Sequence, residues 1–297
     1  MQVMCPANAV AWLLEAALAV STLAFAAMCA LVIATPFETR HAVFVLPYQQ
    51  FTFTELMWLV AALAFAAAQV ARRQVPVWRT PVTVPWLAWM ALMVLAAVFA
   101  DADRANAIKT TGRLVVFGLT GLMVASSVTN ARRMALVLTT AAAAGLVVAT
   151  FATLEVWRVP SIVAGLDAFR DGLSTVGGKV RASSTLQYPT ITAMYLELVF
   201  CGALGVLLWV GERRGWRTAS FAFASLLAII AGLSLTLTRA AMLAAMSGVL
   251  LAAWWRYRQR GADLGFVLVA ACALWLGVAL AAIVGFVPWA RPLMPQF

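Results

Sequence analysis

The sequence is dominated by apolar stretches that are long enough to cross a membrane as helices. Nine of them lie near residues 9–35, 54–71, 84–100, 112–129, 133–156, 190–210, 217–236, 239–255 and 264–287. A hydrocarbon core of about 30 Å takes roughly 17–25 helical residues to cross. Apolar residues make up 64% of the chain and charged residues only 11%, which excludes a soluble domain of this length. We therefore predict an all-α polytopic membrane protein with about nine transmembrane helices, forming a single integral membrane domain over 1–297.

Arginine is concentrated in every second connection between these stretches. With the ends of the stretches included, four short connections carry eleven arginines but only two acidic residues. The arginines are Arg72, Arg73, Arg79, Arg132, Arg133, Arg213, Arg214, Arg217, Arg256, Arg258 and Arg260. Short arginine-rich connections face the cytoplasm, so we expect a cytoplasmic N-terminus and an outward-facing loop over 157–189. The net charge of +10 is explained by this pattern and forms no basic face, so we predict no nucleic-acid partner.

A stretch of 38 residues, Thr218 to Trp255, contains Arg239 as its only charged residue. A single helix of this length would be nearly twice the thickness of the membrane. We therefore expect two spans joined by an outer turn at Ser234–Arg239, with Arg239 at the start of the second span. A turn of this kind needs no arginine, which favours a functional role for this side chain.

Other basic residues lie at the same outer level, namely Arg113, Lys179 and Arg181. The planar guanidinium group binds phosphate oxygens through two hydrogen bonds at once. We therefore predict an anionic ligand at headgroup depth, with a lipid diphosphate as the natural choice. The alternative is that each basic side chain contacts lipid phosphate and ends its helix.

The predicted outer loop over 157–189 contains a short segment with an apolar face. We expect an interfacial helix that Ser161 caps and Gly172 ends, followed by a flexible, hydroxyl-rich stretch over 174–185. Within the spans, Glu197 is expected to pair with Arg239, with a base near the reaction centre as the alternative role. Glu55 is expected to cap the second span.

Two stretches on the predicted outer side resemble a known family. Thr236-Leu-Thr-Arg-Ala240 resembles the S-x-S-R-(G/A) signature of the O-antigen ligase and polymerase superfamily. Arg181-Ala-Ser-Ser-Thr-Leu-Gln-Tyr-Pro-Thr190 is similar to the R-x-x-G-T-F-x-x-P-N stretch of that family. Phe51–Leu56 and Ala107–Arg113 also fit, so the resemblance covers most of the chain.

The resemblance implies a metal-independent glycosyltransferase of GT-C-like architecture in the bacterial inner membrane, active on the periplasmic side. Its donor would be an undecaprenyl diphosphate-linked glycan, and its acceptor the lipid A-core, as in O-antigen ligase. Carried over by motif, Arg181 and Arg239 would bind the diphosphate and stabilise the charge that develops as it leaves. Arg113 and Lys179 would also bind the diphosphate, with Glu197, Thr238 and Tyr188 in supporting positions. No metal or other cofactor is expected.

Two departures from the family pattern matter. Ser184 and Thr190 replace a glycine and an asparagine of the second stretch. The family also has a large outer loop with a histidine that acts on the acceptor, whereas the one histidine here is His41. We expect the sequence to be a piece of a longer enzyme, with 288–297 as the start of that loop; the alternative is a shortened relative that uses another base. The four cysteines, Cys5, Cys29, Cys201 and Cys272, predict neither a metal site nor a disulfide framework.

Several functional alternatives remain open from the sequence. Within the same superfamily these are an O-antigen or polysaccharide polymerase and a protein O-oligosaccharyltransferase. Outside it, a transporter of small anions or lipids would also use outer arginines, although no internal repeat typical of transporters is visible. The last is a membrane scaffold without catalytic activity.

Overall fold

The computed structural model describes residues 6–46, 49–76, 83–100, 104–176, 178–214 and 216–260, and these residues are mostly helical. The long helices in these ranges are α1 (Pro6–Ala34), α2 (Phe53–Arg72), α3 (Thr83–Val98), α4 (Arg104–Ser127), α5 (Ala131–Val156), α7 (Pro189–Arg214), α8 (Trp216–Leu235) and α9 (Arg239–Arg260). Each overlaps in position with one of the first eight predicted spans, although α4 begins eight residues before the predicted stretch 112–129. The ninth predicted span, 264–287, and the segment 288–297 lie outside the described residues.

Four segments of the described residues are long and apolar enough to cross a membrane. They are Glu15–Phe37, Phe53–Arg72, Ala131–Val156 and Pro189–Gly211. Three further apolar helical segments, Thr83–Val98, Ala222–Leu235 and Arg239–Trp255, are shorter. Large apolar side chains remain exposed along these helices, for example Leu92, Leu198 and Leu251. Such exposure is typical of helices that contact lipid, so the chain is a helical membrane protein.

The described part of the chain divides into two compact units, one drawn from residues 1–29 and 58–134 and the other from residues 30–57 and 135–260. In the first unit α3 packs against α4, and the Trp58 indole N–H donates a hydrogen bond of 2.8 Å to the Thr120 hydroxyl. The Arg133 guanidinium lies 5.1 Å from the centre of the Phe25 ring. Both units contain apolar helices, and the single membrane domain stays a prediction.

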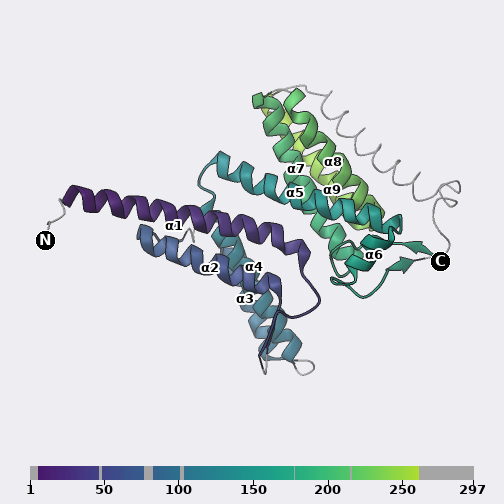
Figure 1. Ribbon diagram of the computed structural model, residues 1–297, viewed down its shortest axis with the longest axis horizontal. Coiled ribbons are helices and arrows are strands. Elements are labelled where there is room, and N and C mark those ends of the chain that lie inside the picture. The colour runs from purple at the N-terminus through teal and green to yellow at the C-terminus, as the bar shows by residue number, and fades with distance from the viewer. Residues whose placement is uncertain are drawn as a thin grey trace. The chain divides into compact units, whose positions relative to one another are not determined.

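The second unit is built around α7, α8 and α9, which lie side by side with α5 running across them (Figure 1). Leu196, Phe200 and Ile229 are fully buried in its core. The helices approach closely where glycine removes a side chain, as is usual for helices that pack in membranes. A Cβ atom at Gly232 of α8 would lie only 2.7 Å from the Cβ of Ala149 in α5.

Gly232→Ala is therefore expected to destabilise the second unit by about 1–3 kcal/mol, because α5 and α8 must move apart to admit the methyl group. The added Cβ would also lie 2.8 Å from the Cα of Ala149, and this backbone atom cannot rotate away. Gly205→Ala in α7 is the matched control, since no atom lies within 4 Å of its added Cβ. Thermal unfolding in detergent measures both variants. Equal melting temperatures for the two would contradict the close packing of α5 on α8.

Short elements connect the long helices. They are a 3-10 turn η1 (Thr35–Phe37), the hairpin β1 (Phe44–Leu46) with β2 (Gln49–Phe51), helix α6 (Pro160–Leu166), and the hairpin β3 (Thr175–Val176) with β4 (Lys179–Val180). Glu55 caps α2 as predicted. Its carboxylate accepts a bond of 3.0 Å from the Thr52 N–H, and the Thr52 hydroxyl accepts one of 3.3 Å from the Glu55 N–H.

Helix α6 differs from its prediction at both ends. Val159 precedes the helix in an extended conformation without a side-chain cap, and Pro160 is its first residue. Proline has no backbone N–H and is favoured at this position, so Ser161 lies inside the helix and the predicted cap is wrong. The helix also ends at Leu166 and not at Gly172.

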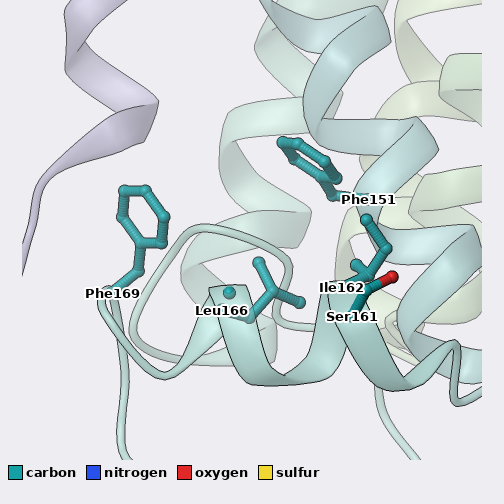
Figure 2. Close-up of a pocket in the computed structure, with 6 residues that line it drawn as sticks. Phe151, Ser161, Ile162, Leu166 and Phe169 are labelled. Carbon is teal, nitrogen blue, oxygen red and sulfur yellow. The ribbon is translucent and has the colours of Figure 1, made fainter.

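The predicted apolar face of this segment lines a hollow beside α5. Ile162 and Leu166 of α6, Phe169 of the next turn and Phe151 of α5 surround a hollow of about 200 Å³ (Figure 2). The interfacial position of α6 stays a prediction.

Candidate functional site

The turn between α8 and α9 lies where the sequence predicts it. Helix α8 ends at Leu235 and α9 begins at Arg239, so only Thr236–Thr238 connect them. The buried Thr236 donates its hydroxyl to the Leu233 carbonyl oxygen at 2.7 Å. Leu237 has a φ of 54°, in the left-handed region that side chains other than glycine rarely adopt. The turn is thus tight and held by a buried hydrogen bond, with the exposed Arg239 directly after it.

Arg181 binds this turn from a position 55 residues earlier in the chain. Its Nε donates a hydrogen bond of 3.0 Å to the Thr236 carbonyl oxygen, and a terminal guanidinium nitrogen donates one of 3.2 Å to the Thr238 hydroxyl. The next residue, Ala182, donates its N–H to the Leu235 carbonyl oxygen at 3.1 Å. The structure thus brings the two stretches that carry Arg181 and Arg239 together at one end of α8 and α9.

The start of α9 adds backbone donors to this place. The first N–H groups of a helix have no partner within the helix and favour a negative charge. Within the described ranges, no acceptor contacts the N–H groups of Ala240 and Ala241. The Thr238 hydroxyl, which precedes the helix, is engaged with Arg181 and with the Thr236 carbonyl oxygen. The exposed Arg239 and these helix N-terminal N–H groups, next to the Arg181 guanidinium that holds the turn, are donors that suit an anion such as a phosphate.

The stretch predicted to be flexible is ordered where it follows Arg181. Residues 182–185 are buried, with at most 1% of their surface exposed. The Ser184 hydroxyl donates to the Val148 carbonyl oxygen at 2.8 Å, and the Thr185 hydroxyl donates to the Pro36 carbonyl oxygen at 2.6 Å. For 182–185 the prediction of flexibility is wrong, because the Ser184 and Thr185 hydroxyls bond to backbone carbonyls and do not face water.

Glu155 at the end of α5 explains how the backbone of this stretch is held. One of its carboxylate oxygens accepts the N–H groups of Ser183 and Ser184, at 3.0 and 2.7 Å. The other lies 2.7 Å from a guanidinium nitrogen of Arg170, and both side chains of this ion pair are buried. Sequence reasoning missed Glu155 and Arg170. The available signal was an acidic residue within an apolar stretch, because such residues usually have a partner.

Three other predicted site residues lie near this region. Lys179 is exposed on β4, and Tyr188 is exposed directly before α7. Glu197 lies in α7, but the expected ion pair with Arg239 does not form. Within the described ranges, Glu197 and Arg239 take part in neither of the ion pairs found, which are Arg170–Glu155 and Arg40–Asp171. Glu197 is eight residues beyond Pro189, or about 12 Å along the helix, whereas Arg239 is exposed at the first residue of α9.

The remaining predictions concern Arg113 and metal ions. Arg113 is exposed on α4 and belongs to the first compact unit, whereas Arg181 and Arg239 belong to the second. Its part in the site therefore stays a prediction. In the ranges that the structure covers, no group of three or more His, Cys, Asp or Glu side chains is placed to hold a metal ion.

Comparison with models of protein families, with curated proteins and with solved structures found no match to this chain.

Proposed function

We propose that this chain binds an undecaprenyl diphosphate-linked glycan on the outer side of the bacterial inner membrane and transfers the glycan to a lipid A-core acceptor, as an O-antigen ligase does. The observation that carries the proposal is the contact between Arg181 and the turn that leads into Arg239. The Arg181 guanidinium is thereby held against the turn that ends at Arg239, the first residue of α9. A diphosphate is the ligand whose charge and oxygen geometry suit these donors.

The donor and the acceptor are assigned from the resemblance to the O-antigen ligase superfamily. The conformation of Ser184 supports that resemblance. The family stretch has a glycine at the position of Ser184, and Ser184 has a φ of 52°. Glycine is the residue that adopts this left-handed conformation without strain. The proline of the same stretch corresponds to Pro189, which is the first residue of α7, a position that favours proline.

The proposed reaction requires stabilisation of charge on the leaving group. The acceptor hydroxyl oxygen bonds to the anomeric carbon as the bond from that carbon to the diphosphate oxygen breaks. The hydroxyl proton passes to a base, and the bonding electron pair leaves with the diphosphate. Arg239 and Arg181 would hold the diphosphate and offset the charge that develops on it. Positioned donors of this kind act without a metal ion.

The proposed orientation agrees with the direction of the helices in the second unit. Arg213 and Arg214 end α7, which has 26 residues and is therefore about 39 Å long. Arg181 precedes the other end of α7. With Arg213 and Arg214 in the cytoplasm, the turn before Arg239 faces the periplasm. A GT-C-like bundle of nine spans is part of this proposal.

A ligand series tests the proposal on the purified protein. Undecaprenyl diphosphate should stabilise the protein by about 2.7 kcal/mol at a concentration of 100 times its Kd, because it binds only the folded state. Undecaprenyl alcohol should have little effect, since it lacks the anionic group that the arginines bind. Thermal unfolding in detergent measures both. Equal stabilisation by the alcohol and the diphosphate would contradict a diphosphate site, and anion uptake into proteoliposomes would favour a transporter instead.

A further inference from the structure

We propose that Glu155 is a positioning residue for Arg181. Its buried carboxylate, held by Arg170, fixes the backbone after Arg181 so that the guanidinium group lies against the turn between α8 and α9. The effect on ligand binding rests on the proposed function, whereas the positioning itself does not.

The contacts form a continuous connection from the loop after α6 to the turn. Arg170 donates to the Gly172 carbonyl oxygen at 2.8 Å and pairs with Glu155 at 2.7 Å. Glu155 accepts the N–H groups of Ser183 and Ser184, which directly follow Ala182. Ala182 is bonded to Leu235, and Arg181 to Thr236. Each step is a hydrogen bond or ion pair between groups that are buried or half-buried.

The backbone conformation explains why a side-chain acceptor is needed here. The N–H groups of two consecutive residues point at one oxygen atom of Glu155. Ser184 is held at a φ of 52°, which persists only where the surroundings determine it strongly. A carboxylate oxygen can accept both N–H groups at once and binds them more strongly than a neutral acceptor does. Without this carboxylate oxygen, the two buried N–H groups would lack a partner, and the stretch 182–185, called the segment below, would be free to move.

Two engineered disulfides report the position of the segment and the integrity of the helices separately. Ala182→Cys with Leu235→Cys joins the segment to the end of α8, since the two residues pack in one buried cluster. Gly248→Cys with the native Cys201 joins α9 to α7, because a Cβ at 248 would lie 2.9 Å from the Cys201 sulfur. In each protein the other native cysteines are replaced by serine. Mass spectrometry of the linked peptides measures the rate at which each disulfide forms.

Glu155→Gln is expected to slow formation of the 182–235 disulfide about tenfold, because Arg170 loses its partner and the segment is held less tightly. The 201–248 disulfide should form at the parent rate. Asp171→Asn is the matched control. It removes the exposed ion pair of the same loop, Arg40–Asp171, and should change neither rate.

Two ways of restoring the position of the segment in Glu155→Gln separate a positioning role from a general effect on folding. Glu155→Gln combined with Arg170→Met removes the unpaired charge and keeps an amide oxygen for the N–H groups, so it should recover most of the 182–235 rate. Glu155→Gln molecules in which the 182–235 disulfide has formed should also bind undecaprenyl diphosphate more tightly than the same protein after reduction.

Two outcomes would overturn the proposal. One is an unchanged 182–235 rate in Glu155→Gln, since the segment would then be held without the carboxylate. The other is equal slowing of both disulfides, which would assign Glu155 to the stability of the whole unit. If the parent protein fails to bind undecaprenyl diphosphate, the proposed function fails, and the two disulfide rates still decide the positioning.

Discussion

Arg239→Ala is expected to lower the rate of glycan transfer by about 10²–10³-fold, the loss seen when a donor that stabilises developing charge is removed. It should also abolish stabilisation by undecaprenyl diphosphate. The unliganded protein should melt at the parent temperature or slightly above it. Arg239 is exposed at the first residue of α9, where a positive charge is unfavourable beside the helix dipole. Transfer is measured in membranes of the native host, and binding by thermal unfolding of the purified protein.

Two further variants define this effect. Arg239→Lys keeps the charge but loses the planar pair of donors, so it should recover only a minor part of the activity. Arg213→Ala removes an exposed arginine at the other end of the second unit, where it lies 5.5 Å from the Trp209 ring, and should leave transfer unchanged. Parent-level transfer by Arg239→Ala would remove the basis of the proposed function.

The features that were predicted correctly depend on the lengths of apolar stretches and on the spacing of neighbouring residues. The turn before Arg239 follows from the length of Thr218–Trp255, because 38 residues cannot form one span. The cap of α2 follows from the spacing of Thr52 and Glu55, which are three residues apart. Helix positions follow in the same way from runs of apolar residues.

The features that could not be predicted depend on contacts between distant residues. The stretch 182–185 contains hydroxyl-bearing residues, a composition typical of flexible loops. It is ordered because Glu155, 28 residues before Ser183, supplies an acceptor for its backbone. Nothing local to Ser183 indicates that partner. The expected pairing of Glu197 with Arg239 failed for a related reason. It relied on a similar predicted depth of the two residues in the membrane, and a similar depth does not mean that two side chains touch.

Arg170→Met is expected to destabilise the second unit by about 3–5 kcal/mol, because it leaves the carboxylate of Glu155 buried without a counter-charge. Arg170 and Glu155 are 3% and 0% exposed, so water cannot replace the lost partner. Asp171→Asn should cost no more than about 1 kcal/mol, since Arg40 and Asp171 are 40% and 89% exposed. Thermal unfolding in detergent compares the two variants.

The double variant Glu155→Gln with Arg170→Met distinguishes a buried charge from lost packing. Removing both charges relieves the desolvation cost, and the glutamine oxygen still accepts N–H groups from Ser183 and Ser184. The double variant should therefore be more stable than Arg170→Met alone, although it carries one more substitution. If it is instead less stable, the Arg170 side chain contributes mainly through packing. The carboxylate of Glu155 would then not depend on Arg170, and the loop after α6 would not be coupled to Arg181 through this ion pair.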